Sequence, residues 1–377
     1  LWTILLTTAW MTACKSQEKG QPNGDLAART LGMVSSAHPI ATEAGLQILK
    51  EGGNAFDAAV AVAAALNVVE PTNSGIGGYG TILVYDAKND RIRFLDSSGK
   101  IPAAVNSDVF RKPHPNYREN RYGPKAVSTP GNVNAWEALS NTYGCLDWGK
   151  LFEPAITAAE EGFELDERTA RSIGHAYEDF PEQAKQIYGK KGEALKVGDR
   201  LVQKDLASSL RLIAEQGART VYGGEIGKAM DRAMKEAGGF LSLDDLMNDT
   251  AEWWEPIHIT YRDCEIYTAS PPSTAFPSLI RLGIMSRFDV ASLGHNSFEM
   301  LHRFLEVTKQ AFWCRLRYAG DPEVNPPPLR TLLSEDYWKA QAEMIGMDKS
   351  KPFEYPGQEK EKVQHTTHFV TADAEGN

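Results

Sequence analysis

The sequence contains few cysteines and none of the patterns that hold a metal ion. Only four of its 377 residues are cysteines: Cys14, Cys145, Cys264 and Cys314. No two of them form a Cys-x-x-Cys pair, and none joins histidines at the spacing of a zinc site. The residues therefore indicate no metal. The last three cysteines are interpreted as buried thiols, and a disulfide between two of them stays open.

Phosphate-binding signatures are absent too. The glycine-rich segment Ser74–Gly80 (SGIGGYG) precedes a predicted strand. A phosphate loop would instead lead into a helix and end in Gly-Lys-Ser/Thr. No nucleotide cofactor is therefore expected. The glycines indicate either close backbone packing, which we favour, or turns with positive φ beside a site.

Basic residues are in deficit. The chain has 40 Lys and Arg against 50 Asp and Glu, a formal net charge of -10. Because a nucleic-acid partner requires a basic face that neutralises phosphates, this balance argues against one. The composition, 42% hydrophobic and 24% charged, is that of a globular protein with a large core or two domains.

No apolar run is long enough to span a membrane, but the first 14 residues (LWTILLTTAWMTAC) are typical of a signal peptide. Their end, Met11–Cys14, is similar to a bacterial lipobox, in which the cysteine is lipidated. Residues 15–29 are predicted to be a polar tether. We therefore expect a periplasmic protein of the bacterial envelope, anchored at Cys14, with a plain secretory signal or a disordered tail as the alternatives. Because no initiator Met precedes Leu1, the start is expected to be truncated.

The remaining chain is predicted to be α+β, rich in helices, with no internal repeat. Hydrophobic periodicity and end signals predict helices over residues 38–50, 55–69, 132–143, 148–161, 204–215, 224–237, 243–247 and 296–318. Alternating and β-branched segments predict strands over 81–86, 91–96, 261–269 and 366–373. The first two strands form a hairpin around residues 88–90.

Thr366 is the strongest catalytic candidate. A threonine hydroxyl is a poor nucleophile, but a free α-amine on the same residue can act as its base. Such an amine exists within a chain only after cleavage of the preceding peptide bond. The segment before Thr366, residues 362–365, is polar and charged, as an exposed cleavable linker would be. The alternative is an ordinary threonine at the start of a strand.

Several collinear segments together resemble the γ-glutamyltranspeptidase family. The longest is GLQILKEGGNAFDAAVAVAAALNVVEP (45–71), which is followed by SGIGGYG (74–80) and TPGNVNAWEAL (129–139). PAITAAEEGF (154–163), LGHNSFEMLH (293–302), RYAGDP (317–322) and TTHF (366–369) complete the series. The resemblance covers roughly residues 30–377.

The resemblance implies an N-terminal-nucleophile hydrolase, an αββα sandwich built by two subunits of one self-cleaving precursor. The scissile bond would join His365 to Thr366, and Thr366 would be the nucleophile. Residues 30–365 would form the large-subunit region, and residues 366–377 would start a small subunit that is truncated here. The family's oxyanion glycines and paired serines belong to that small subunit, which would be the main partner of this chain.

One departure from the family concerns the substrate. After the second strand, many members carry an arginine that binds the substrate α-carboxylate, and Ser98 stands at its position. A serine cannot replace a bidentate guanidinium. Lys100 would then supply a cation, as in oxamate amidohydrolase-like members, unless it is only a solvated hairpin residue. Tyr79, in a run that is usually all glycine, is expected to narrow the pocket.

The leading hypothesis is therefore an enzyme that cleaves a γ-glutamyl-type amide, as glutathione hydrolases do, through an acyl-threonine. One alternative is an amidohydrolase for another small acid amide such as oxamate. The other is a non-catalytic envelope lipoprotein that keeps the fold. The expected partners are a small-molecule amide, the chain's own small subunit, and a membrane only through the lipid at Cys14.

Overall fold

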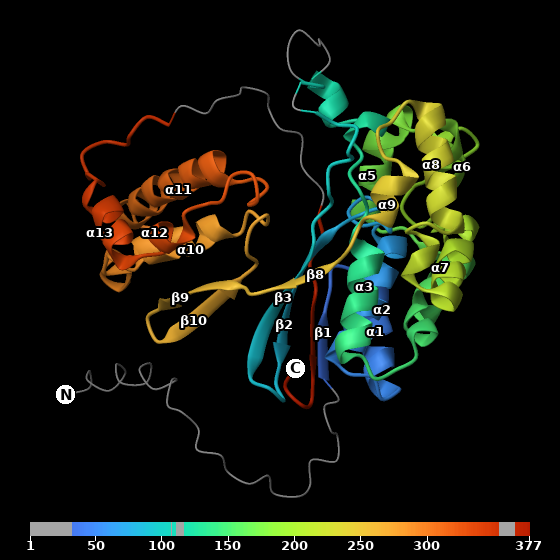
Figure 1. The fold of residues 1–377 in the computed structure, drawn as a ribbon, viewed down its shortest axis with the longest axis horizontal. Helices are drawn as coiled ribbons and strands as arrows, with labels where there is room; N and C mark the ends of the chain where they lie inside the picture. The colour runs from blue at the N-terminus through green and yellow to red at the C-terminus, as the bar shows by residue number, and fades with distance from the viewer. Residues whose placement is uncertain (1–31, 107, 111–116, 354–365) are drawn as a thin grey trace, which may run out of the picture.

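The structure, a computed structural model, describes residues 32–106, 108–110, 117–353 and 366–377. It is a mixed fold, about 49% helical. Strands run through the middle, the helices of the first two thirds of the chain lie on one side, and a smaller helical group lies on the other (Figure 1). The signal peptide, the tether, Cys14 and His365 fall outside the described residues, so their predicted roles stay predictions.

Helix α2 (Ala55–Val69) is the centre of the larger core. Asn54 and Asp57 form a capping box at its start, which satisfies backbone N–H groups that the helix leaves unpaired. Every residue of α2 except Ala59 is buried. An apolar helix of this kind is stable only inside a core, and its neighbour α1 (Pro39–Lys50) covers one side of it.

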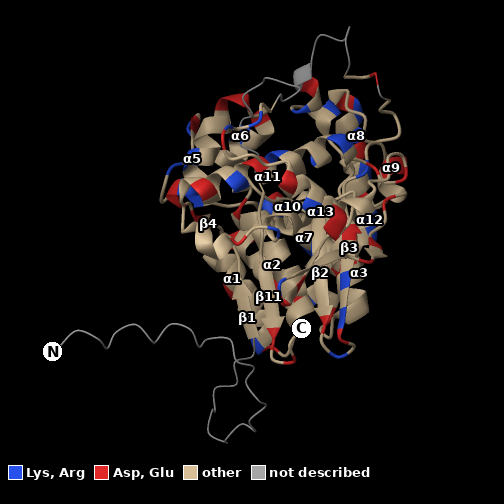
Figure 2. Cartoon of the chain, turned by 90° about the vertical axis from the view of Figure 1, so that its left-hand side faces the viewer, with Lys and Arg blue, Asp and Glu red and all other residues tan. Residues whose placement is uncertain are grey.

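Two small antiparallel sheets lie against these helices. In the first, β1 (Gly32–Ser35) pairs with β11 (Val370–Asp373), so the two ends of the described chain meet. In the second, β2 (Gly80–Asp86) and β3 (Arg91–Ser97) form the predicted hairpin, and β8 (Glu252–Trp254) adds a third strand. Figure 2 shows positions of charged residues spread over the outer helices, whereas the strands are mostly made of other residues.

Further helices complete the larger core. They are α3 (Asn132–Tyr143), α4 (Glu153–Glu161), α5 (Glu167–Ala176), α6 (Glu182–Tyr188), α7 (Lys204–Gln216), α8 (Glu225–Ala237) and α9 (Leu243–Met247). Two short ribbons lie among them, β4 (Phe163–Glu164) with β7 (Arg200–Leu201) and β5 (Gly189–Lys190) with β6 (Glu193–Ala194).

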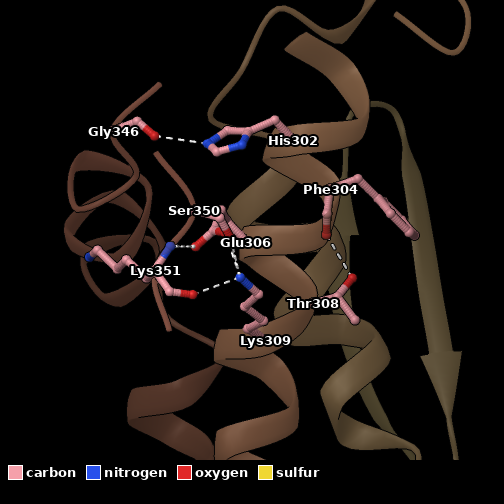
Figure 3. Close-up of polar contacts among 8 residues, drawn as sticks. All are labelled: His302, Phe304, Glu306, Thr308, Lys309, Gly346, Ser350 and Lys351. Atoms are coloured by element: carbon pink, nitrogen blue, oxygen red, sulfur yellow. Dashed lines mark hydrogen bonds and ion pairs between the residues drawn. The ribbon is translucent and has the colours of Figure 1, made fainter. Parts of the chain in front are cut away.

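The smaller helical group has a separate core. It contains the hairpin β9 (Ile257–Tyr261) and β10 (Cys264–Thr268) and the helices α10 (Phe276–Met285), α11 (Phe298–Tyr318), α12 (Leu329–Leu332) and α13 (Glu335–Glu343). Glu306 of α11 is 4% exposed. Its carboxylate accepts bonds from Lys309 Nζ at 2.7 Å and Ser350 Oγ at 2.7 Å, which fastens the chain after α13 to α11 (Figure 3).

Several predicted elements differ from the observed ones. The predicted helix 148–161 is divided into a 3-10 turn, Trp148–Phe152, and α4, because Pro154 sets a new helix start. The predicted strand 261–269 is the second half of a hairpin, whose turn contains Arg262 at a φ of 55°. The predicted strand 366–373 begins only at Val370, because β1 pairs with no residue before it.

The interpretation of the later cysteines as buried thiols is wrong for two of the three. Cys145 and Cys264 are exposed, and only Cys314 is buried. All three are free thiols, so no disulfide joins them. Cys145 lies in a loop whose position is set by Asp57, which accepts a bond from the Cys145 backbone N at 3.1 Å.

Within the described residues, no helix is both long and apolar enough to cross a membrane. The same residues contain no cluster of three or more His, Cys, Asp or Glu that could hold a metal ion.

Candidate active site

Thr366 is exposed and lies in irregular backbone four residues before β11. Its neighbour Thr367 is half-buried and donates a hydrogen bond from Oγ1 to Glu70 Oε2 at 2.6 Å. Glu70 is 4% exposed and directly follows the last residue of α2. The candidate nucleophile is thus next to a residue that is tied to the end of the most buried helix.

The other end of β11 is tied to the start of the same helix. Asp373 Oδ2 accepts a bond from Ala55 N at 3.0 Å, and Thr371 Oγ1 donates to Ala55 O at 2.8 Å. Burial by itself would raise the pKa of Asp373, but the bonds from Ala55 and from the Asn377 side chain and backbone outweigh it and lower this pKa below its usual value. Asp373 is therefore a charged acceptor at a helix N-terminus, where the helix dipole favours negative charge.

Glu70 has further polar neighbours. Asn73 Nδ2 donates to Glu70 Oε1 at 3.2 Å, and Arg168 Nη1 lies 3.7 Å from the same oxygen. His38 caps α1 by accepting a bond from Ile40 N. Burial lowers the pKa of His38, although the charges of Asp166 and Glu70 oppose this.

The glycine-rich segment joins this end of α2 to β2. The packing interpretation of its glycines holds for Gly78, but not for Gly75 and Gly77, where a Cβ would meet nothing within 4 Å. Gly78 O accepts bonds from Gly131 N at 3.0 Å and Asn132 N at 3.1 Å, and Gly75 O accepts one from Asn132 Nδ2 at 3.0 Å. A Cβ on Gly78 would lie 2.9 Å from Asn132 Nδ2. None of the glycines from Gly75 to Gly80 has a positive φ. The segment therefore lies directly against the start of α3.

Ser98 and Lys100 lie at the end of β3, at the far end of that segment. Ser98 Oγ donates to Asp96 Oδ1 at 2.7 Å. Lys100 Nζ lies 3.7 Å from Glu252 Oε1, with both side chains about half exposed. Asp96 and Glu252 stand directly opposite each other in the β3–β8 pair, where like charges repel. Lys100 thus offsets part of a local acidic excess.

Two other residues shape this end of the sheet. Tyr79 is 58% exposed, and a Cβ on Gly99 would lie 2.7 Å from Tyr79 Cδ1, so the ring rests on the backbone between Ser98 and Lys100. Asp249 is buried, and burial raises its pKa. The bond from Asn134 and the charge of Lys100 lower this pKa, but by less.

The predicted site residues therefore lie at the two ends of the glycine-rich segment and do not form one cluster. Thr366 and Thr367 lie at its α2 end, whereas Ser98 and Lys100 lie at its β2 end; among the described residues no hydrogen bond joins the two pairs. Glu70 and Thr367 were not identified from the sequence as site residues. The available signal was Glu70 itself, a carboxylate directly after a helix that is almost wholly apolar.

Comparisons with known proteins agree with the motifs. The profile of the family described as Gamma-glutamyltranspeptidase matches residues 41–377. The chain is 36% identical over 368 residues to the glutathione hydrolase proenzyme of Bacillus subtilis (strain 168), covering 92% of this chain and 63% of that protein. It is also 36% identical over 358 residues to the Acylase ACY 1 proenzyme of Pseudomonas sp. (strain V22), covering 92% and 64%.

A solved structure agrees as well. The γ-glutamyltranspeptidase of Helicobacter pylori matches with a TM-score of 0.83 and 33% identity, over 85% of this chain and 94% of that one. Such structures are N-terminal-nucleophile hydrolases, so the predicted fold class is confirmed. The chain spans 63% of the length of the Bacillus subtilis relative.

Proposed function

Because this chain belongs to the γ-glutamyltranspeptidase family of enzymes, we propose that its precursor cuts itself between His365 and Thr366 and then cleaves a small acid amide. The observation that carries this proposal is the position of Thr366. It is exposed, it precedes β11, and its neighbour is bound to Glu70 at the end of α2. A reacting hydroxyl must be accessible and also held in place, and this arrangement meets both needs.

Self-cleavage would proceed through an ester. The Thr366 hydroxyl attacks the carbonyl carbon of His365, the peptide C–N bond breaks, and the Thr366 nitrogen takes a proton to become the α-amine. Water then hydrolyses the ester, which leaves a carboxylate on His365 and a free hydroxyl on Thr366. In later turnovers the amine accepts the hydroxyl proton as Thr366 attacks the substrate amide, and water or an amine releases the acyl group.

The rest of a small subunit would complete the site. Four exposed apolar side chains lie on β1, β11 and β2: Met33, Val370, Leu83 and Tyr85, which are 71%, 56%, 47% and 43% exposed. Large apolar side chains that gather on a surface are normally covered. We propose that sequence beyond Asn377 covers these side chains of the two sheets and supplies the oxyanion donors.

The substrate would carry an acid group, with a γ-glutamyl amide as the first candidate. Ser98, whose hydroxyl is engaged with Asp96, cannot form the two-pronged carboxylate clamp of an arginine. This favours a second candidate, the amide of another small acid such as oxamate. Relatives of similar identity carry different names, an acylase and a glutathione hydrolase, which supports considering more than one substrate.

For location, we propose that Cys14 is lipidated and that the enzyme works at the periplasmic side of a bacterial envelope. The support is the lipobox-like sequence Met11–Cys14.

The acyl-threonine offers a direct test of the proposed chemistry. The complete precursor, including any sequence encoded beyond Asn377, would be incubated with a γ-glutamyl anilide and with oxamate and quenched in acid. Peptide mass spectrometry should find the acyl mass on the peptide that begins at Thr366. Release of product without an adduct on Thr366, or with an adduct elsewhere, would contradict the proposed nucleophile.

A further inference from the structure

Glu70 is buried in a position where a carboxylate needs partners. It is 4% exposed and follows fifteen helical residues of which all but one are buried. A buried charge is costly unless hydrogen bonds satisfy it. Asn73 and Arg168 approach Oε1, and the Thr367 hydroxyl binds Oε2. A hydroxyl-to-carboxylate bond of 2.6 Å is charge-assisted and therefore strong and directional.

We infer that Glu70 is a positioning residue for Thr366, because it holds Thr367 by its hydroxyl and so determines where the reacting hydroxyl stands. The inference rests on the proposed function of Thr366. Residues 366–369 have no ladder bonds in the described part of the chain, since β11 begins at Val370. The Thr367 side chain supplies the restraint that the backbone lacks, one peptide unit (about 3.8 Å) from Thr366.

The lengths of α2 and of the chain from Thr367 to Asp373 explain why a residue at the C-terminal end of α2 can position Thr367. Fifteen helical residues span about 22 Å at 1.5 Å each. The six steps from Thr367 to Asp373 span about 20 Å at 3.3 Å each. Asp373 binds Ala55, the first residue of α2. At this distance along the strand, Thr367 lies beside Glu70, the residue directly after α2, and binds it. The helix thus sets the axial position of the threonine, and a shift of about 1 Å can slow a reaction about 100-fold.

The opposite end of β11 offers a matched control. Thr371 also donates from its hydroxyl to a group of α2, the carbonyl of Ala55. It differs from Thr367 because Thr371 lies within the ladder opposite Val34, and Asp373 binds Ala55 independently. Loss of the Thr371 hydroxyl therefore removes a bond of the same kind without freeing the strand.

The test uses Thr367→Val, Thr367→Ser and Thr371→Val in the complete precursor, with the first-order rate of self-cleavage and the melting temperature as readouts. Thr367→Val keeps the side-chain shape and should slow cleavage at least tenfold. Thr367→Ser keeps the hydroxyl and should cleave within threefold of the wild type, as should Thr371→Val. In protein that has cleaved, Thr367→Val should lower kcat and leave KM within twofold, because Glu70 is buried and would act only through Thr367.

A double-mutant cycle assigns the effect to Glu70. If Glu70 and Thr367 act together, the double variant Glu70→Gln/Thr367→Val should cleave itself at a rate within twofold of that of Glu70→Gln alone. The inference would be overturned if the Thr367→Val precursor cleaved at a rate within threefold of the wild type. It would also be overturned if Thr371→Val slowed cleavage as much as Thr367→Val does, or if the Thr367→Val precursor did not melt cooperatively. A wild-type precursor that never cleaves would instead refute the proposed function itself.

Discussion

At the scale of the residue, the partners of each carboxylate determine which side chains remain free to bind a substrate. Asp96 engages the Ser98 hydroxyl, and Glu252 lies within ion-pair distance of Lys100. Lys100 is half exposed, and exposed ion pairs contribute little, so it could exchange Glu252 for the acid group of the proposed substrate. Ser98 cannot offer the same charge. Specificity should therefore depend more on Lys100 than on Ser98.

Ser98→Arg should raise kcat/KM for a γ-glutamyl anilide about tenfold or more, because it provides a two-pronged donor for the α-carboxylate. Ser98→Lys is the matched control, since it adds the same charge without the fork, and it should gain much less. Lys100→Ala should reduce kcat/KM for the natural substrate. If wild type already equals an ordinary transpeptidase and Ser98→Arg changes nothing, the idea of a divergent substrate is wrong.

Asp373→Asn should destabilise the folded chain by about 2 kcal/mol at pH 7, because it removes a charged acceptor from the start of α2. The pKa of Asp373 is lowered on folding, so its contribution is complete above the unfolded pKa of about 3.9 and is lost as pH falls through the lower folded value. The difference between variant and wild type, measured by urea unfolding, should therefore shrink below pH 4.

Glu375→Gln is the control for this experiment. It removes a charge from the same turn, but its exposed side chain does not bind Ala55, and its backbone bond to Asp373 is kept. It should change stability by less than about 0.5 kcal/mol. An equal loss in both variants would mean that the net charge of the turn, not the bond to α2, stabilises this end of β11.

At the scale of the element, local signals predicted those parts of the structure that local interactions determine. Helix 55–69 has the predicted bounds because Asn54 caps it and Pro71 follows it. α10 was missed because it follows a run of prolines and serines that indicates a loop. The bond between Glu70 and Thr367 joins residues 297 positions apart. No periodicity or end signal reports a contact of that separation, so the sequence predicted a role for Thr366 but did not connect Thr367 with Glu70.

Two helical glycines should respond to alanine with opposite signs. In α10, a Cβ on Gly283 would lie 2.2 Å from Trp338 Cε2 of α13, so Gly283→Ala should destabilise the smaller core by about 1–3 kcal/mol. In α5, a Cβ on Gly174 meets nothing within 4 Å, so Gly174→Ala should stabilise by about 0.5–1 kcal/mol through helix propensity. Urea unfolding measures both, and loss of stability in both would contradict this packing.

At the scale of the whole molecule, the described residues form two hydrophobic cores and expose large apolar side chains on β1, β2 and β11. The larger core positions Glu70, the glycine-rich segment and the end of β3. The smaller core holds the chain after α13 through Glu306, ahead of residues 354–365. The two sides of the proposed cleavage point are thus attached to different cores, α11 on one side and α2 on the other.

Location is also a property of the whole molecule. If Cys14 is lipidated, the wild-type protein should sediment with membranes, and Cys14→Ser should be released into the soluble periplasmic fraction. Stable anchoring requires more than one acyl chain, so the peptide that begins at Cys14 should carry several acyl chains. Soluble wild-type protein whose N-terminus lies at another residue would refute the anchor without affecting the proposed chemistry.

The central claim is that Thr366 becomes an N-terminal residue, and intact-mass measurement of the purified complete precursor tests it most directly. The account predicts two polypeptides, with His365 ending the first and Thr366 beginning the second, and a single uncut chain for Thr366→Ala. Active wild-type protein that stays one chain, or that is cut at a different bond, would contradict it.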